Sequence, residues 1–309
     1  MLRTAFATLF LIAASSSAFA QERLTVLLDW FVNPDHAPLI VAEARGAFAD
    51  RGITVEIVAP ADPAAPPRLV AAGEGDIAIT YQPSLYQQVS EELPVMRVGT
   101  LVATPLNSLV ALDGGGIETL SDLAGKTVGY SVGGFEDALL GRMLASVDLT
   151  LDDVRLVNVN FALTPALLSG QVDAVIGAFR NFELTQIRLE GAEGKAFLPE
   201  EHGVPSYEEL IFITHRDRAA DPAIGHLLDA LDETTAWMQA HPEEAERLFF
   251  EAQPDLDDEL NRAAFEDTLD KFAPQSRPLD VAGYEAFAQF MTDAGLVAEL
   301  PPLDTYARE

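Results

Sequence analysis

Two stretches decide the fold of this sequence: LVAAGEGDIAI at residues 69–79 and LLSGQVDAVI at residues 167–176. Each stretch predicts the end of a helix, followed by a glycine that stops the helix, an aspartate and a short apolar strand. Because the same unit occurs twice in one chain, we expect two similar lobes, each built around its own sheet.

Strand and helix patterns alternate on both sides of these stretches. Strands are predicted at residues 24–28, 53–58, 76–79, 127–130, 153–159, 174–177 and 209–214, with an extended run at 98–112 that Pro105 interrupts. Helices are predicted at 36–50 (ending at Gly52), 68–72, 84–90, 137–146 and 165–168, and then at 222–240, 242–251, 257–271 and 281–294. Strands separated by helices indicate βαβ units and mainly parallel sheets.

The chain is expected to cross between the lobes twice, near Thr104-Pro105 and near Leu210–Phe212. Lobe 1 would hold residues 21–104 plus 211–309, and lobe 2 residues 105–210. Two α/β lobes joined by a two-segment hinge are typical of proteins that close around a ligand.

The first twenty residues have the pattern of a secretory signal. Arg3 precedes an apolar run at residues 5–14, and Ala18-Phe19-Ala20 forms an A-x-A site. We expect cleavage after Ala20 and export to the periplasm. A membrane-anchoring helix is the alternative, but the run is shorter than the about 20 apolar residues that span a bilayer.

Composition excludes several classes of protein. The 309 residues contain no cysteine, which rules out thiolate nucleophiles, iron–sulfur clusters and a lipid-anchored N-terminus. The net charge of −30 repels phosphate backbones, so we expect no nucleic-acid partner. The chain is long enough to be stabilised by its core alone.

Four segments that follow predicted strands are rich in polar and aromatic residues: 29–36, 80–84, 131–136 and 178–183. Ligands of open α/β sheets bind beyond the carboxyl ends of the strands, and two of these segments fall in each lobe. The candidate ligand-binding residues are Trp30, Asn33, His36, Tyr81, Gln82, Gly133, Phe135, Glu136, Phe179, Asn181 and Glu183.

These side chains favour an aromatic ligand that carries amino groups. Trp30 and Tyr81 offer flat faces to a planar ring, and Glu136 and Glu183 can accept hydrogen bonds from an amine. Asn33 and Gln82 can each donate and accept, and Gly133-Gly134 would present backbone N–H groups to a ligand oxygen.

Each candidate also has a purely structural interpretation. Trp30 could be a core aromatic residue, and Phe135 and Phe179 could be core or lining residues. His36 could only begin a helix, and Glu136 could only stabilise a helix N-terminus. Glu183 could do the same, or pair with Arg180.

Catalytic motifs are weak or missing. Gly125-Lys126-Thr127 resembles the end of a phosphate loop, but Leu120 stands where the loop requires glycine. The five histidines lack the spacing of a metal site, and no G-x-S-x-G elbow is present. We therefore expect no metal, no cofactor and no enzyme activity.

Several of these motifs resemble one known family. They are Leu28-Asp29-Trp30 with Asn33 and His36, Gly75–Gln82, and Pro165–Glu183. Over most of residues 24–215 the sequence is similar to the family of thiamine-pyrimidine precursor proteins, which includes periplasmic binding proteins of ABC importers for formylaminopyrimidine.

The resemblance implies the periplasmic-binding-protein fold of type II and a pyrimidine held between aromatic rings. Trp30 and Tyr81 match the stacking positions, and Asn33, Glu136 and Glu183 match polar contacts. The sequence departs from the family at residues 129–135, where relatives have a Gly-Tyr-Pro-Gly-like turn.

An enzymatic branch of the same family makes the pyrimidine. Its members carry a lysine and a histidine at positions that resemble Thr80 and Ser84 here, and a cysteine-rich motif that this chain lacks. The resemblance therefore favours a monomeric receptor that passes a small heteroaromatic ligand to an ABC permease in the inner membrane. The same fold with a sulfonate or riboflavin-like ligand, an enzyme, and a sensor partner remain as alternatives.

Overall fold

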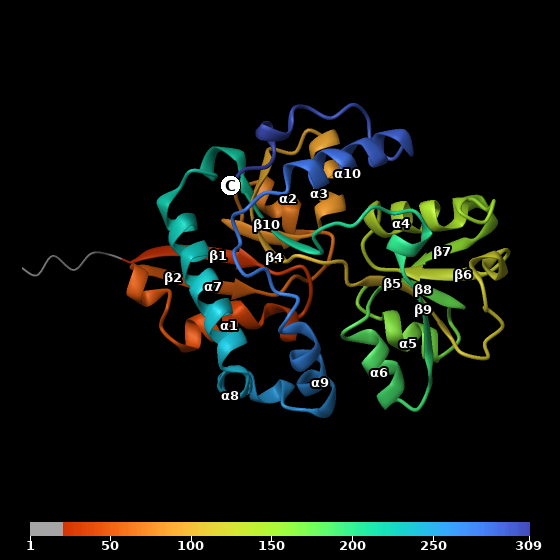
Figure 1. Cartoon of the computed structure of the whole chain (residues 1–309), viewed down its shortest axis with the longest axis horizontal. Coiled ribbons are helices and arrows are strands. Elements are labelled where there is room, and N and C mark those ends of the chain that lie inside the picture. Colours follow the sequence, from red (N-terminus) through yellow and green to blue (C-terminus); the bar gives the residue numbers. More distant parts are fainter. Residues whose placement is uncertain (1–20) are drawn as a thin grey trace, which may run out of the picture.

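Two five-stranded sheets, each flanked by helices, form two lobes side by side (Figure 1). This computed structural model describes residues 21–309, so the predicted signal segment lies outside the described residues. The first sheet has the order β2 (Ile53–Val58), β1 (Glu22–Leu27), β3 (Ile77–Thr80), β10 (Leu210–His215) and β4 (Val95–Val102). The second has the order β7 (Arg155–Asn158), β6 (Thr127–Tyr130), β8 (Ala174–Phe179), β5 (Asn107–Leu112) and β9 (Gly194–Phe197).

Ten α-helices are seen in the described part of the chain, with short 3-10 turns between them. They are α1 (Ala37–Ala44), α2 (Pro66–Ala71), α3 (Gln82–Ser90), α4 (Phe135–Ala145), α5 (Leu163–Leu168), α6 (Glu183–Leu189), α7 (Pro222–Ala240), α8 (Pro242–Ala252), α9 (Glu259–Thr268) and α10 (Val281–Asp293). The C-terminal helices return to the first lobe, where α7 packs against β1, β2 and α1. None of these helices, within residues 21–309, is both long and apolar enough to cross a bilayer.

The two sheets have the same topology. In each sheet four strands run in one direction, as the predicted βαβ units require, and the fourth strand in the order, β10 or β5, runs against both of its neighbours. Each reversed strand is the first strand after the chain crosses between the lobes. The sequence pattern predicts the parallel strands but gives no sign of this reversal.

The repeated sequence unit has the same structural role in both lobes. Gly73 and Gly170 end their helices with φ of 76° and 71°, a left-handed conformation that glycine adopts without strain. The carboxylate of Asp76 then accepts the backbone N–H of Thr25 at 2.6 Å, and that of Asp173 accepts the N–H of Thr127 at 2.8 Å. Each aspartate thus fastens the start of its strand to the neighbouring parallel strand.

Some predicted elements differ from the structure. The helix predicted over residues 36–50 ends at Ala44, because a glycine turn at Gly46 (φ 75°) interrupts it before the 3-10 turn at Ala49–Arg51. The strand β9 and the helix α6 are absent from the predicted elements. The chain passes between the sheets at residues 103–106 and 198–209.

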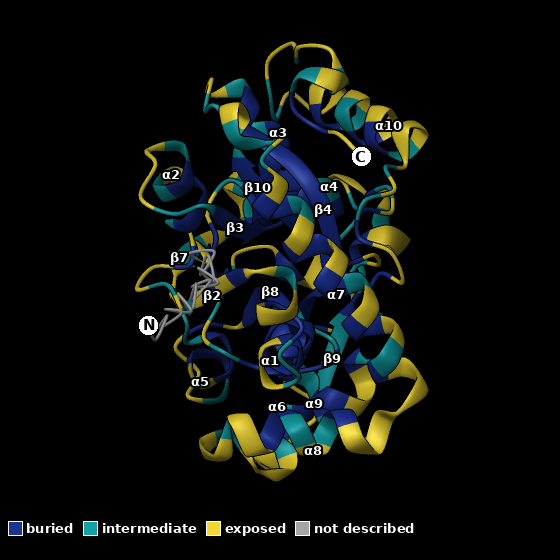
Figure 2. Cartoon of the chain, turned by 90° about the vertical axis from the view of Figure 1, so that its left-hand side faces the viewer, coloured by how far each residue is buried: buried dark blue, intermediate teal, exposed yellow. Residues whose placement is uncertain are grey.

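The apolar cores of the two lobes are in contact. The larger apolar core, around the first sheet, also includes Phe135 and Leu139 from α4 of the second lobe. Buried strands lie beneath helices whose outer faces are exposed, as on α8 and α10 (Figure 2). The lobes are therefore packed against each other rather than held only by the two crossings.

We expect Asp173→Ala to lower the free energy of unfolding by about 1–3 kcal/mol, because the N–H of Thr127 would lose its acceptor at the start of β6. Chemical denaturation in urea measures this change. Asp152→Ala, an exposed acidic position in the same lobe, is the control and should change stability little. Equal effects of the two substitutions would show that the repeated aspartate does not fasten the strands.

Candidate functional site between the lobes

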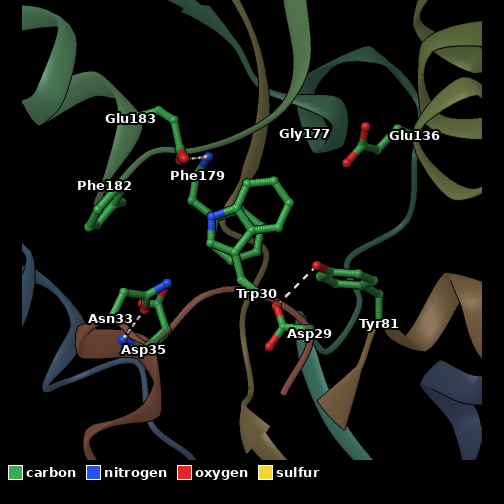
Figure 3. A pocket seen from close by; sticks show the side chains of 10 residues that line it. All are labelled: Asp29, Trp30, Asn33, Asp35, Tyr81, Glu136, Gly177, Phe179, Phe182 and Glu183. Atoms are coloured by element: carbon green, nitrogen blue, oxygen red, sulfur yellow. Dashed lines mark hydrogen bonds between the residues drawn. The ribbon is translucent and has the colours of Figure 1, made fainter. Parts of the chain in front are cut away.

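A small pocket lies where the carboxyl ends of strands from both sheets meet (Figure 3). The residues that line it are Asp29, Trp30, Asn33, Asp35 and Tyr81 from the first lobe, and Glu136, Gly177, Phe179, Phe182 and Glu183 from the second. The enclosed volume is about 20 Å³, which is room for about one water molecule. A ring-sized ligand could enter only if the lobes separate or a lining side chain moves.

Trp30 occupies the centre of this pocket (Figure 3). It follows β1 but packs against the core of the second lobe, and its ring meets that of Phe161 edge-on with centroids 4.7 Å apart. Phe31 lies next to it, 40% exposed, and its ring centroid is 6.1 Å from that of Phe182. Aromatic residues of both lobes thus form one cluster around the indole.

Tyr81 is oriented by a buried hydrogen-bond chain. The backbone N–H of Asn33 donates to Nδ1 of His36 at 3.3 Å, so the proton of the imidazole is on Nε2, which lies 3.0 Å from Oδ1 of Asp29. Oδ2 of Asp29 accepts the hydroxyl of Tyr81 at 3.0 Å. One face of the tyrosine ring stacks on Phe135, with centroids 4.8 Å apart and planes 17° apart.

Glu136 reaches the pocket because residue 177 has no side chain. Gly177, near the end of β8, has φ of 99°, and a Cβ there would overlap the carboxyl group of Glu136. Oε2 of Glu136 accepts the backbone N–H of Ser131 at 2.6 Å. Glu136 is in the first turn of α4, so it also has the helix-terminus role given above as its structural alternative.

Glu183 is the first residue of α6 and accepts the backbone N–H of Phe179 at 2.7 Å. The alternative in which it pairs with Arg180 is wrong. The guanidinium of Arg180 turns away from the pocket and pairs with Glu200 at 2.7 Å. The pocket is therefore lined by four carboxyl groups, and no lysine or arginine is among its lining residues.

A second buried network joins the lobes beside the pocket. Nδ2 of Asn181 donates to Oδ1 of Asp35 at 2.6 Å and to Oγ1 of Thr268 at 2.7 Å. All three side chains are buried. Because Asn181 belongs to the second lobe and its partners to the first, these bonds break whenever the lobes separate.

Burial shifts the pKa values of the carboxyl groups that line the pocket. Burial raises the pKa of Glu136 to about 8 and that of Glu183 to about 8. Burial also raises the pKa of Asp35 to about 6, although its hydrogen bond from Asn181 opposes this shift. A ligand that donates hydrogen bonds would favour the ionised carboxylates, and a ligand that accepts would favour their acid forms.

Six of the eleven predicted residues line the pocket: Trp30, Asn33, Tyr81, Glu136, Phe179 and Glu183. The other five lie outside its lining. His36, Phe135 and Asn181 act behind it as described above. Gln82 is buried against Tyr86 and the backbone of Glu208. Gly133 and Gly134 line a neighbouring cavity, also bordered by Thr80 and Ser84, and the carbonyl of Gly134 accepts a bond from Gln87.

Four lining residues were not among the predicted ones: Asp29, Asp35, Gly177 and Phe182. Each of them falls inside, or one residue before, a segment already singled out as following a strand. Their position in the sequence, next to the predicted residues, is the signal that could have identified them. No group of three or more His, Asp or Glu side chains in residues 21–309 is placed to hold a metal ion.

Comparison with known sequences identifies the family. The family described as NMT1/THI5 like matches residues 33–245. A protein of Haemophilus influenzae named as a thiamine biosynthesis protein is 51% identical, and the match covers 94% of this chain and 93% of that protein. The formylaminopyrimidine-binding protein of Halalkalibacterium halodurans is 33% identical, with 81% of this chain and 76% of that protein covered. This chain belongs to the NMT1/THI5-like family, which confirms the resemblance seen in its motifs.

Relatives that are named as enzymes also match this chain. The 4-amino-5-hydroxymethyl-2-methylpyrimidine phosphate synthase of Legionella pneumophila is 29% identical, and the match covers 82% of this chain and 81% of the enzyme. Among solved structures, the alkanesulfonate-binding protein of Xanthomonas axonopodis pv. citri, bound to MOPS, matches with a TM-score of 0.72 at 18% identity, covering 94% of this chain and 99% of that one. The chain has the periplasmic-binding-protein fold, which confirms the predicted fold class.

The raised pKa values predict that stability falls as pH rises. Between the unfolded pKa of about 4 and the folded pKa of each buried acid, the folded chain binds more protons than the unfolded chain. We therefore expect the thermal midpoint to decrease from pH 5 to pH 8, and to decrease less in the double variant Glu136→Gln/Glu183→Gln. Calorimetric scans across this range measure both slopes.

The control for this prediction is Glu74→Gln, an exposed acidic position. It should keep the wild-type dependence on pH. An identical slope in wild type and the double variant would show that these two carboxyl groups do not hold protons in the folded chain.

Proposed function

We propose that this chain is the periplasmic solute-binding component of an ABC importer and that it captures a thiamine-related aminopyrimidine such as formylaminopyrimidine. The observation that carries the proposal is the interlobe pocket, in which an indole and carboxyl groups from both lobes converge. The formylaminopyrimidine-binding relative supports the same assignment.

The chemistry of the pocket suits an aminopyrimidine. Such a ring has an exocyclic N–H donor next to a ring-nitrogen acceptor, and one carboxyl group can pair with both when it is protonated, or accept from the amine when it is ionised. Glu136 and Glu183 stand on one side of the pocket and Asp29 and Asp35 on the other (Figure 3). The aromatic rings of Trp30 and Phe179 supply apolar faces between them.

Capture would proceed by closure of the proposed lobes, residues 21–104 plus 211–309 and residues 105–210. The ligand first binds to one open lobe, and closure then adds the groups of the other lobe. For this order to hold, the ligand must bind the closed arrangement more tightly than the open one. The closed surface, composed of both lobes, would be what a permease recognises.

Two other functions have less support. A sulfonate needs positive charge or several free donors, whereas the residues lining this pocket offer four carboxyl groups and no cationic side chain. A pyrimidine synthase would need reactive side chains. At the positions that resemble those of the lysine and histidine of the enzymatic branch, this chain has Thr80 and Ser84. His36 is fully buried behind Asp29.

Fluorescence can test the ligand class directly, because the chain has only two tryptophans. Trp237 lies in α7 and stacks on His241, outside the lining of the pocket. In a Trp237→Phe variant we expect formylaminopyrimidine to change the emission of Trp30, and taurine, a sulfonate, to have no effect. A Trp30→Phe variant is the matched control and should give no response. A response to taurine alone would contradict the proposal.

We expect Glu183→Gln to weaken the binding of formylaminopyrimidine by about 1–3 kcal/mol, because a charge-assisted hydrogen bond to the amine would be lost. Titration of the same fluorescence signal gives the dissociation constants. Glu190→Gln, at the other end of α6, should bind like wild type. An unchanged affinity in Glu183→Gln would remove this carboxyl group from the site.

A further inference from the structure

The two crossings between the lobes are fastened to each other by one carboxyl group. Glu209 is fully buried and immediately precedes β10, at the end of the second crossing. Its Oε2 accepts the backbone N–H of Leu106 at 2.6 Å and that of Asn107 at 2.9 Å, where the first crossing enters β5. A change in the angle between the lobes must act on this junction, because both chain segments of the hinge pass through it.

Leu106 and Asn107 also accept hydrogen bonds from Arg180. The backbone N–H of Arg180 donates to the carbonyl of Leu106 at 2.9 Å, and its Nε donates to the same carbonyl at 3.2 Å. Its Nη2 donates to the carbonyl of Asn107 at 2.9 Å. Arg180 is flanked in sequence by Phe179, which lines the pocket, and Asn181, which bonds to the first lobe.

Asn107 also supports the other wall of the pocket. Its Oδ1 accepts the backbone N–H of Gly177 at 3.1 Å. Gly177 is the residue over which the carboxyl group of Glu136 lies. Leu106 and Asn107 therefore connect the hinge carboxylate to both parts of the second lobe that line the pocket, the Gly177 backbone and the loop at residues 179–183.

We propose that Glu209 and Arg180 are positioning residues for ligand capture, which couple the hinge to the shape of the pocket through Leu106 and Asn107. Neither residue lines the pocket, so neither touches the ligand in the closed arrangement. The role rests on the proposed function, since capture by closure requires that the pocket takes its binding shape when the hinge closes. The hydrogen bonds of Glu209 and Arg180 transmit the movement of the hinge to the lining of the pocket.

Hydrogen exchange resolved to single amides by NMR tests the coupling without any ligand. In Glu209→Gln we expect the amides of Leu106 and Asn107 to exchange about tenfold faster, the scale of a lost charge-assisted hydrogen bond. The proposal requires that the amides of Gly177 and Phe179, which Glu209 does not touch, also exchange faster. Faster exchange confined to residues 106 and 107 would overturn it and leave Glu209 with a local structural role.

A second variant and a binding measurement complete the test. Arg180→Lys keeps the positive charge and the backbone bond to Leu106, but loses the guanidinium bonds to the carbonyls of Leu106 and Asn107. It should speed exchange at the same four amides even if Glu209→Gln does not fold. Both variants should bind formylaminopyrimidine about tenfold more weakly. Glu201→Gln, at an exposed position within the second crossing, should match wild type. Wild-type affinity in both variants would overturn the proposal. Absence of binding to wild type would instead contradict the proposed function and leave the exchange result to decide the coupling.

Discussion

The burial of carboxyl groups from two lobes in one pocket constrains the rest of this structure. Asp29 and Asp35 come from one lobe and Glu136 and Glu183 from the other, and the lining residues include no lysine or arginine. Ionised carboxylates taken out of water are costly unless they are paired, so this arrangement favours protonation or a ligand that donates hydrogen bonds. The lining therefore favours an occupant that donates hydrogen bonds over an anion.

The fold makes such a pocket possible by bringing the same edge of two sheets together. The pocket residues Trp30, Tyr81 and Phe179 stand at or just after the carboxyl ends of β1, β3 and β8, so these ends of both sheets face the same pocket. Helix α9 contacts both α6 of the second lobe and the turn at Pro34–His36 of the first. The aromatic cluster around Trp30 and the bonds of Asn181 then hold the lobes in contact, and opening must break both.

Local patterns in the sequence were sufficient for most of the fold. The strands at residues 53–58 and 127–130 and the helix at residues 222–240 have the bounds that the sequence predicts, because apolar periodicity and first-turn prolines define them locally. The reversed strands, β9 and α6 were not predictable in this way. The direction of a strand depends on where the chain arrives after it crosses between lobes, which is a non-local property.

The candidate site shows the same division. Residues that follow strands could be recognised as candidates, but only the structure separates Trp30 and Glu136, which line the pocket, from His36 and Phe135, which support Tyr81 from behind.

The most direct test of the account is a calorimetric titration of formylaminopyrimidine into wild type and into the double variant Glu136→Gln/Glu183→Gln. The account predicts one site per chain in wild type and at least about tenfold weaker binding in the double variant. Equal affinity in the two proteins, or no binding to wild type, would contradict it.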